Sequence, residues 1–402
     1  MTGQPLHVAF ISHSGQLGGA EICLVELVEG LTGLYGVRAD VVLPRPGPLG
    51  ARLAAAGGHP QVLRHAGWAT AVGSWPACVP MAALNIVAVL RLVASLRRLR
   101  PDIVATNSLI NPAGAYAARL AGIPHVWLVH EYGDLDHGYR FLLGVERSLR
   151  EVGRLSARVM TCSRALARRV SEHVPPDRIE VAHYAVTEGL DRPLAPATCV
   201  AGRLRLLVLG RKHPGKGQAE AVRAVGRLRA RGVDVRLRAV GQPQGTYALE
   251  LERLSRSLGL EDRVELVPWV IDPVAEIDAC DALLLCSRSE AFGRVVVEAM
   301  KRDRPVIVAD AGGAPELVAE SGGGLLYPPG DDEALACVIE RLAADPVEAR
   351  RLAGAGRAWA QRHCTLQGYA RAFLDAANRA QQRTRWVPSA SDTSGFRGGP
   401  SC

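Results

Sequence analysis

The sequence predicts an α/β protein built from two doubly wound domains that face each other across a cleft. Short apolar, β-branched runs alternate with longer segments of helical periodicity, and this alternation is typical of a parallel sheet covered on both faces. The alternation stops around residues 186–202 and then restarts. The chain has 402 residues, which is enough for two domains that each bury a full core.

The first half of the chain carries one complete set of alternating elements. Strands are expected at 6–11, 39–43, 101–107, 125–130 and 157–163. Helices are expected near 19–33, 49–57, 81–99, 111–121 and 140–152. Because helices separate the strands, the sheet should be parallel, and residues 1–190 are expected to form a Rossmann-like domain.

The second half repeats the pattern. Strands are expected at 205–210, 233–241, 263–268, 281–287, 305–310 and 323–328, and the last helices over 331–344, 346–362 and 365–383. The second Rossmann-like domain should span 203–364, after a linker at 191–202 that is rich in Pro, Gly and Ala. The helix at 365–385 is expected to pack back toward the first domain. The tail at 386–402 has turn formers without core residues and is expected to be disordered.

Composition excludes several classes of protein. The chain has 48 Lys+Arg against 40 Asp+Glu, a net charge of +8, but the surplus is scattered, so no nucleic-acid partner is expected. The nine cysteines form no CxxC pair, which favours a reduced, cytoplasmic protein without structural zinc. The first apolar run is too short for a secretory signal, and the longest one falls short of a membrane span.

Ligands of open α/β sheets bind beyond the carboxyl ends of the strands, so the loops there are the candidates for a site. The loop at 12–21 contains Gly15, Gly18 and Gly19, which let a ligand approach the backbone closely. It is not a GxGxxG motif, and the next strand lacks the terminal acid that a dinucleotide site needs. A plain strand-to-helix turn is the alternative.

The loop at 209–218 stands out by its lysines. The whole chain has only three lysines, and two of them, Lys212 and Lys216, lie here beside Arg211. A lysine kept in a chain that otherwise prefers arginine indicates that a compact point charge is needed. Guanidinium and ammonium groups on a Gly/Pro loop that opens a helix suit a diphosphate. A solvated basic turn is the alternative.

The segment 287–300 is the most informative. Glu298 lies among apolar residues of an expected helix, where a carboxylate needs hydrogen-bond donors such as a ribose diol. Glu290 follows a strand and can face a reacting centre. The alternative is a surface Glu with a second Glu paired to Arg. A further Gly-rich turn at 310–324, ending in Glu316, suits sugar hydroxyls, although a plain turn explains it nearly as well.

These segments together resemble a known family, the retaining glycosyltransferases of family 4 with the GT-B fold. SEAFGRVVVEAM at 289–300 looks like the family's E-x7-E motif, and RPVIVADAGGAPELV at 304–318 looks like its Gly-Gly-x-x-Glu turn. GRKHPGKG at 210–217 is similar to its phosphate loop, and SGQLGGAE at 14–21 to its N-terminal Gly-Gly loop. The resemblance covers about residues 5–383.

The resemblance implies roles for individual residues. Arg211 and Lys216 would hold the donor diphosphate, Glu298 would bind the nucleotide ribose, and Glu290 would contact the donor sugar. His130, at a strand end, matches the family's cleft histidine near the anomeric carbon. Further donor contacts are implied for Gly18, Gly19, Phe292, Gly293, Arg294 and Val295. The family usually has Asn-Gly where this chain reads AHYAV at 182–186, which puts the hinge and an acceptor contact in doubt.

The implied activity is retaining transfer of a hexosyl or amino-hexosyl group from a UDP- or GDP-linked sugar. The acceptor would be a small molecule, a glycan or a lipid-linked sugar. Arg211 and Lys216 would stabilise the departing diphosphate, and Glu290 and His130 would act near the sugar. No cofactor besides the donor substrate is expected. Front-face attack, with the leaving phosphate as the base, is preferred to a covalent glycosyl-enzyme.

Two features could mislead. Asp134-Leu135-Asp136 spells DxD, the metal-binding triplet of the other glycosyltransferase fold, but three letters recur by chance and the basic loop already neutralises a diphosphate. No metal site is therefore expected, and the triplet could instead contact the acceptor. The helix at 81–99 is amphipathic with a basic end, as in lipid-dependent relatives. A core-packed helix is favoured over membrane contact.

Two rival functions fit the sequence less well. A nicotinamide-dependent dehydrogenase would need a ribose-binding acid after the second strand, which is missing. A catalytically silent module that binds nucleotide sugars would keep the fold but lose an acid or a base, whereas Glu290, Glu298, Arg211 and Lys216 are all present. The sequence leaves open the donor base, which depends on backbone near 267–271, and the acceptor, which depends on N-terminal loops such as 64–80.

Overall fold

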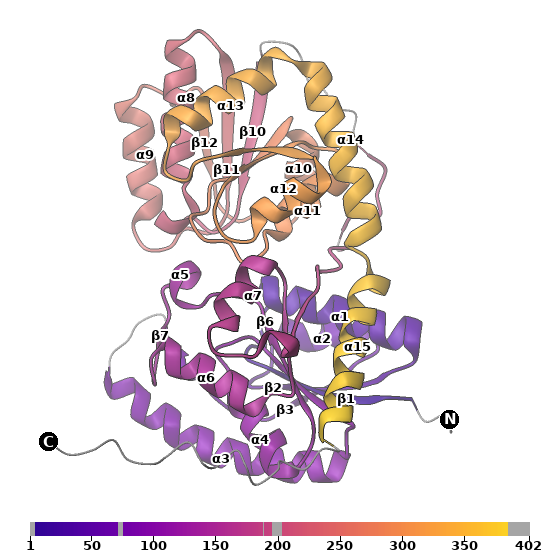
Figure 1. Ribbon diagram of the computed structural model, residues 1–402. Helices are drawn as coiled ribbons and strands as arrows, with labels where there is room; N and C mark the ends of the chain where they lie inside the picture. The colour runs from indigo at the N-terminus through magenta and orange to yellow at the C-terminus, as the bar shows by residue number, and fades with distance from the viewer. Residues whose placement is uncertain (1–4, 71–74, 188, 195–202, 385–402) are drawn as a thin grey trace, which may run out of the picture.

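The computed structural model describes residues 5–70, 75–187, 189–194 and 203–384. It confirms the predicted fold class: two α/β domains, each with a parallel sheet between helices, are stacked end to end (Figure 1). The linker residues 195–202 and the tail at 386–402 lie outside the described residues.

The N-terminal sheet has seven parallel strands in the order β3-β2-β1-β5-β6-β8-β9. Their bounds are β1 (His7–Ser12), β2 (Arg38–Leu43), β3 (His59–Val62), β5 (Ile103–Asn107), β6 (His125–Val129), β8 (Arg158–Thr161) and β9 (Ile179–Val181). The order reverses direction between β1 and β5, and this switch point is where open sheets bind ligands. The loops after β1, β5 and β6 therefore open into one region.

Helices cover both faces of this sheet. They are α1 (Gly19–Tyr35), α2 (Pro48–Ala55), α3 (Trp75–Leu99), α4 (Ala113–Ala121), α5 (Asp134–His137), α6 (Val145–Leu155) and α7 (Arg164–Ser171). Within β1, Val8 and Phe10 pack in one buried cluster with α1, whereas Ala9 and Ile11 pack in another with α3 and α4. Because alternate side chains are buried on opposite faces, the strand reads as a continuous apolar run.

Edge strands were missed from the sequence. β3 and β9 flank the sheet, and their side chains are half-buried or exposed, so neither forms an apolar run. β3 also contains Pro60, which edge strands tolerate because they need fewer ladder hydrogen bonds. A small antiparallel pair, β4 (Ala69–Thr70) with β7 (Arg140–Phe141), was missed for the same reason, since two residues carry no period.

The C-terminal sheet has six parallel strands in the order β12-β11-β10-β13-β14-β15. They are β10 (Arg203–Leu209), β11 (Asp234–Val240), β12 (Val264–Val267), β13 (Ala282–Leu285), β14 (Val306–Ala309) and β15 (Gly324–Tyr327). The helices are α8 (Gln218–Ala230), α9 (Tyr247–Ser257), α10 (Pro273–Ala279), α11 (Arg294–Lys301), α12 (Ala314–Ser321), α13 (Asp332–Ala344) and α14 (Pro346–His363). All six expected strands are present within two residues of their predicted ends.

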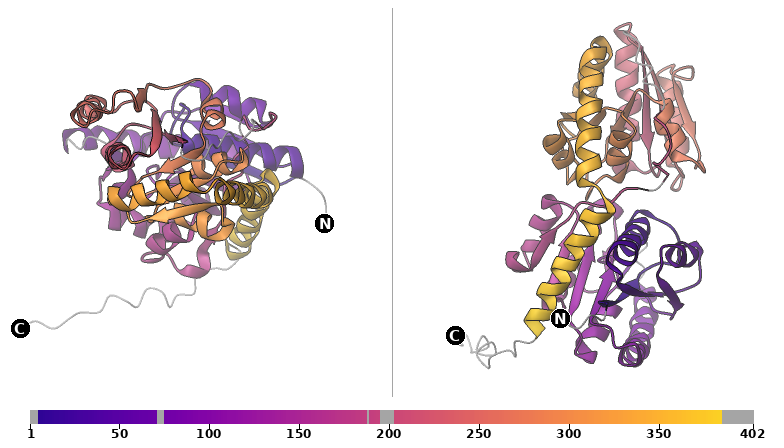
Figure 2. Two further views of the ribbon diagram at one scale, coloured as in Figure 1. Left: turned by 90° about the horizontal axis from the view of Figure 1, so that it is seen from above. Right: turned by 90° about the vertical axis from the view of Figure 1, so that its right-hand side faces the viewer.

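The last helix, α15 (Leu366–Thr384), returns to the N-terminal domain. Figure 2 shows it continuing from α14 and running down along that domain, where it packs against α1 and β8. Phe373 of α15 packs against Phe10 of β1 with ring centroids 5.4 Å apart and the ring planes tilted by 36°. The chain passes between the domains twice, near Val186 and near Cys364. Lys301 contacts both segments, because its Nζ donates to Val186 O at 2.8 Å and to Cys364 O at 2.6 Å.

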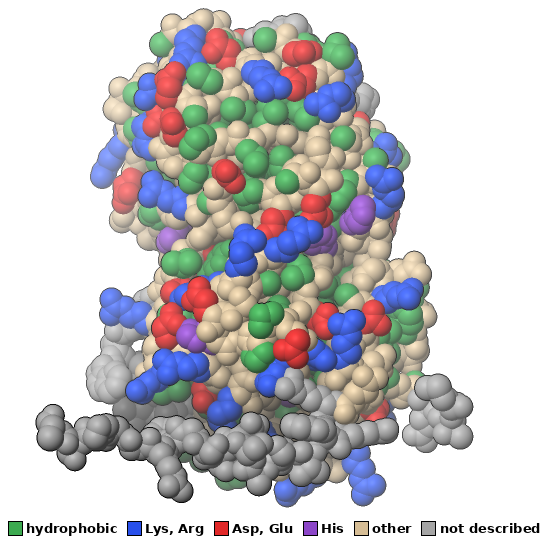
Figure 3. All heavy atoms as spheres, viewed as in Figure 1, with side chains coloured by type: hydrophobic (Ala, Val, Ile, Leu, Met, Phe, Trp, Pro, Cys, Tyr) green, Lys and Arg blue, Asp and Glu red, His purple; other side chains and the backbone are tan. Residues whose placement is uncertain are grey.

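α3 meets the expectation of a core-packed helix only in part. Leu92 and Leu96 are buried, but Ile86 and Leu90 are 66% and 62% exposed beside exposed Arg91. Contact of this helix with a membrane, the alternative that the sequence did not favour, can be tested by liposome co-sedimentation. Among the described residues, none of the helices is long and apolar enough to cross a bilayer. On the face shown in Figure 3, basic and acidic side chains are interspersed over both domains.

Candidate active site

A cleft of about 360 Å³ lies between the carboxyl ends of the two sheets and is lined by both domains. Nine of the eleven residues singled out in the sequence line it: Gly19, His130, Arg211, Lys216, Glu290, Phe292, Gly293, Arg294 and Val295. Gly18 is the residue before the first turn of α1, next to Gly19. Glu298 lies one turn further along α11, with an oxygen 3.8 Å from Nε of Arg294.

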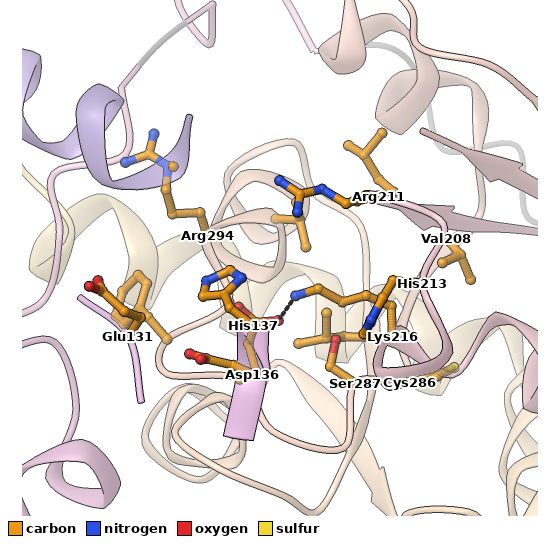
Figure 4. Close-up of a pocket in the computed structure, with 18 of the residues that line it drawn as sticks. Glu131, Asp136, His137, Val208, Arg211, His213, Lys216, Cys286, Ser287 and Arg294 are labelled. Carbon is orange, nitrogen blue, oxygen red and sulfur yellow. Dashed lines mark hydrogen bonds and ion pairs between the residues drawn. The ribbon is translucent and has the colours of Figure 1, made fainter. Parts of the chain in front are cut away.

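The loop between β10 and α8 places its cations at the cleft. A single 3-10 turn, Pro214–Lys216, ends at Gly217, whose φ of 70° is open mainly to glycine. A Cβ at Gly217 would come within 2.1 Å of Cys286 O, so the loop can approach β13 only with glycine there. Arg211 is exposed to the cleft, and Lys216 Nζ lies 2.7 Å from Glu290 Oε2 (Figure 4).

The second lysine of this loop has a different task. Lys212 is 2% exposed, and its Nζ donates to Gly241 O at 2.6 Å and also to Val267 O. Burial lowers the pKa of this ammonium. Lys212 thus ties β11, β12 and the phosphate loop together. Of the two lysines that the sequence groups at a diphosphate, only Lys216 lines the cleft.

Glu290 is supported by two neighbouring loops. Arg288 N donates to Gly215 O at 3.0 Å, which joins the segment before Glu290 to the phosphate loop. Gly313 N donates to Glu290 O at 2.6 Å, and a Cβ on Gly312 would come within 2.4 Å of that same oxygen. The Gly-Gly turn after β14 therefore supports the backbone of Glu290. The turn is not among the described residues that line the cleft.

Glu316, considered for sugar hydroxyls, binds the other domain. Its two carboxylate oxygens accept from Arg164 N at 2.8 Å and from Ala165 N at 2.7 Å. These amides open α7, where a helix favours a negative charge. The sugar-binding interpretation of Glu316 is therefore wrong in this structure, because its oxygens are occupied by the N-terminus of a helix in the N-terminal domain.

Arg294 also connects the domains. Arg294 lines the cleft, and its guanidinium donates to Glu26 of α1 at 2.6 and 3.2 Å. Burial opposes the charge of Arg294, while the neighbouring Cys23 and Glu26 raise its pKa well above the usual range. Glu26 in turn accepts from Thr187 N at 2.7 Å, next to the crossing between the domains. The donor loop is thus fastened to α1 by a buried ion pair.

His130 is held at both ring nitrogens. Its Nε2 lies 2.7 Å from Asn107 Oδ1, and its Nδ1 lies 2.7 Å from Tyr184 Oη. The amide oxygen can only accept, so Nε2 carries the proton and Nδ1 accepts from the Tyr184 hydroxyl. Burial, with smaller contributions from His13 and Arg294, lowers the pKa of His130 to about 3. His130 lines the cleft as a neutral imidazole without a free nitrogen, which does not support a role in proton transfer.

Tyr184 was not predicted as a site residue, although the segment that contains it was noted to depart from the family pattern. It lies in AHYAV at 182–186. Its ring is 5% exposed and packs edge-on against Phe292 of the donor loop, with centroids 4.7 Å apart. Two residues later, Val186 adopts a φ of 40°, a strained conformation for a β-branched residue. A lone tyrosine in a connector gives no sequence signal for such a contact.

Carboxylates line the N-terminal side of the cleft. Glu131 Oε1 accepts from Leu109 N at 2.8 Å and from Ser108 Oγ, and burial raises its pKa. Asp136 accepts from Tyr132 N at 2.9 Å and from Gly133 N at 2.8 Å, so the second acid of the DxD triplet caps its own turn. Within the described chain, the cluster with metal-ligand geometry is Glu146, Glu172 and His173, which is outside the cleft lining.

Comparison with known proteins agrees with this geometry. The model of glycosyl transferases group 1 matches residues 200–359, and that of Glycosyltransferase Family 4 matches residues 17–188. The D-inositol 3-phosphate glycosyltransferase of Stackebrandtia nassauensis is 31% identical over 285 residues, covering 63% of this chain and 63% of that protein. The match thus spans less than two thirds of that relative. The 2-deoxystreptamine glucosyltransferase of Streptomyces kanamyceticus is 30% identical, over 61% of this chain and 68% of that protein.

Solved structures show the same fold. HepE of Anabaena, crystallised with UDP, superimposes with a TM-score of 0.76 at 23% identity, covering 93% of this chain and 100% of HepE. WaaG, a glycosyltransferase involved in lipopolysaccharide biosynthesis, superimposes with a TM-score of 0.64 at 16% identity, covering 92% of this chain and 98% of WaaG. With one family model on each domain and a cleft between two Rossmann-like sheets, the chain belongs to the family 4 glycosyltransferases of GT-B fold.

Proposed function

We propose that this protein is a retaining glycosyltransferase that moves a hexosyl or amino-hexosyl group from a UDP- or GDP-linked sugar to an acceptor hydroxyl. The observation that supports this most directly is the Lys216–Glu290 pair beside Arg211, at the mouth between the two domains. Two cations suit a diphosphate, and a carboxylate next to them suits the hydroxyls of the attached sugar. HepE has also been crystallised with UDP-glucose.

The chemistry follows from the positions of the charges. The acceptor oxygen attacks the anomeric carbon as the bond from that carbon to the β-phosphate oxygen breaks. Negative charge grows on the diphosphate, where Arg211 and Lys216 stabilise it. The proton of the acceptor hydroxyl passes to the leaving phosphate oxygen on the same face of the sugar. Bond formation and bond breaking on one face retain the anomeric configuration.

The leaving phosphate is the base that the cleft favours. The described lining of the cleft has three carboxylates, and each has a partner inside the protein. Glu290 pairs with Lys216, Glu131 accepts from Ser108, and Asp136 caps its own turn. Both oxygens of Asp136 and one oxygen each of Glu290 and Glu131 are engaged in these contacts, so none of the three stands in the cleft as an unpartnered carboxylate. This supports front-face attack without a glycosyl-enzyme intermediate.

Metal independence is part of the proposal. Arg211 and Lys216 supply positive charge where a bound divalent cation would otherwise act. Asp136 spends both oxygens on backbone amides, and Asp134 lies 3.9 Å from Arg169 Nη2. Turnover that is lost with a chelator and restored by Mg²⁺ or Mn²⁺ would contradict this point.

A reducing, cytoplasmic setting fits the free cysteines at 23, 162, 280, 286, 337 and 364.

The substitution Glu290→Gln tests the assignment. We expect turnover to fall by about 100-fold or more, because the sugar contact is lost in the transition state, while the affinity for the free nucleotide changes by less than about threefold. Arg236→Ala, an exposed arginine of β11 away from the cleft, serves as the control. A Glu290→Gln variant with the normal rate would exclude Glu290 from the reaction.

The donor is identified by binding. Thermal unfolding with a panel of nucleoside diphosphates should show a raised Tm for UDP or GDP and little change for ADP or CDP. The matching sugar donors are then tested for transfer to polyols, aminocyclitols and lipid-linked sugars. Nucleotide release with a transferred sugar excludes the silent binding module, whereas binding without release in any donor would support it.

A further inference from the structure

The DxD segment builds a helical turn that faces the other domain. Asp136 caps α5 through the amides of Tyr132 and Gly133, and the turn ends at His137. Ser289 Oγ, in the loop that leads to Glu290, donates to Leu135 O at 2.8 Å. This hydrogen bond fastens α5 of the N-terminal domain to the donor loop of the C-terminal domain.

The position of α5 places His137 opposite the phosphate loop. Figure 4 draws its imidazole in the middle of the cleft group, with Arg211 and Lys216 on one side and Asp136 on the other. The ring stacks on Tyr139 with centroids 5.2 Å apart and stays open to the cleft. The charged and titratable groups that face it are Asp136, Tyr139, Arg211, Lys216 and Glu290.

We propose that His137 binds the diphosphate of the donor from the N-terminal side and takes up a proton as the diphosphate binds. This inference rests on the proposed function, since it assumes that Arg211 and Lys216 receive a diphosphate. It adds a third cation to the site, from a domain that otherwise lines the cleft with carboxylates and neutral groups. The empty and the occupied cleft then differ by one proton on His137.

The electrostatics of the cleft account for this proton. In the empty cleft, loss of hydration lowers the pKa of His137; Asp136 counteracts this, while Lys216 and Arg211 lower the pKa further. A bound diphosphate brings negative charge between the imidazole and the two cations. The repulsion then becomes an attraction, because an opposite charge within a few ångströms favours the protonated form. His137 is therefore neutral before binding and an imidazolium afterwards.

Calorimetry of UDP and GDP binding measures the proton directly. Titrations near pH 7 in buffers with different ionisation enthalpies report how many protons are taken up per nucleotide. We expect the wild-type protein to take up about one proton per bound nucleotide and His137→Gln to take up none, with affinity about tenfold weaker, as for a lost hydrogen bond to a charged group. His137→Lys should restore the affinity without proton uptake, since lysine is already charged.

Two matched variants locate the effect. His213, in the phosphate loop, also lines the cleft, and its Nδ1 accepts from Gly215 N at 3.1 Å. A proton on this nitrogen would break that hydrogen bond, so His213→Gln should keep the proton uptake. His59→Gln, at an exposed position of β3, should behave as the wild type. Circular dichroism confirms that each variant is folded.

The outcomes separate the two proposals. Unchanged uptake in His137→Gln, or uptake lost only in His213→Gln, overturns the assignment to His137 while the diphosphate site stands. A wild-type protein that binds UDP or GDP without proton uptake also overturns it. If the wild-type protein binds neither nucleotide, the proposed function itself fails.

Discussion

The two walls of the cleft are built in different ways. The C-terminal wall draws Arg211, Lys216 and Glu290 from two loops that follow adjacent strands, β10 and β13. The N-terminal wall is assembled from distant parts of the chain. His130 is held by Tyr184, 54 positions away, and by Asn107, 23 positions away. One wall is a pair of local motifs, and the other is a tertiary network.

This difference matches a division of chemistry. The C-terminal wall presents the cations Arg211 and Lys216, which can stabilise the negative charge of a leaving diphosphate. The N-terminal wall presents the neutral imidazole of His130, the imidazole of His137 and two carboxylates, Glu131 and Asp136, that are already hydrogen-bonded. A site of this kind can hold the donor mainly through the C-terminal wall, with His137 as the proposed N-terminal contact, and leave the other N-terminal residues free to differ with the acceptor. Substitutions on each wall test whether the two can be changed independently.

The largest effect is expected for the C-terminal wall. Lys216→Ala removes a positive charge from the leaving group and should lower kcat by about 100- to 1000-fold, as when a preorganised oxyanion donor is lost. Thermal stability should change little, because the side chain is half-buried and has one carboxylate partner. Steady-state kinetics with the identified donor and a melting curve measure both. A kcat within about threefold of the wild type would remove Lys216 from the reaction.

The neighbouring lysine should give the opposite result. Lys212→Met removes the ammonium donor of the buried Gly241 O and one of the two donors of Val267 O, which also accepts from Gly241 N. We expect a loss of about 2 kcal/mol in the free energy of unfolding, measured by urea denaturation. Lys216→Met is the matched control and should lose less than about 0.5 kcal/mol, the typical size of a surface substitution. Equal losses in the two variants would show that the lysines share one role.

On the N-terminal wall, Tyr184→Phe deletes one hydroxyl without emptying the ring site. His130 Nδ1 then loses its donor, and the imidazole can reorient. We expect kcat to fall by about tenfold with the KM for the donor nearly unchanged, since one hydrogen bond in a catalytic network is lost. The edge-on packing against Phe292 is retained, so the protein should stay folded. Tyr369→Phe, a neighbour that also packs on Tyr184, controls for a general change in packing.

The smallest effect concerns pH. His130 has a pKa of about 3 in the folded protein, below that of an unfolded histidine near 6.5. Between these values the unfolded chain binds a proton that the folded protein does not, so stability is lost as the pH falls below 6.5. His130→Gln should reduce this loss by up to about 1.4 kcal/mol over the first pH unit below about 6.5. Denaturation curves at about pH 7.5 and 5.5, on either side of that value, measure the difference, and an unchanged slope would contradict a neutral His130.

Much of the fold was predictable because strands that are buried on both faces of a sheet form continuous apolar runs in the sequence. The strands at 7–12, 38–43 and 203–209 are apolar runs, and helices with one apolar stripe separate them. The N-terminal edge strands β3 and β9 were not predictable, because their exposed and half-buried side chains form no apolar run. The exposed apolar side chains of α3 were not predictable either, because an apolar stripe indicates which side can be buried and not whether a partner covers it.

The same distinction holds for the site. The sequence by itself determined the two-domain α/β fold and the loops at the strand ends, because Gly, Lys and Glu at fixed short spacings act through local backbone geometry. Only the tertiary structure decided that Lys212 points inward while Lys216 reaches Glu290, that Glu316 serves a helix of the other domain, and that Tyr184 holds His130. The physical reason is that the direction and partner of a polar side chain depend on contacts between segments far apart in the chain, which no local spacing encodes.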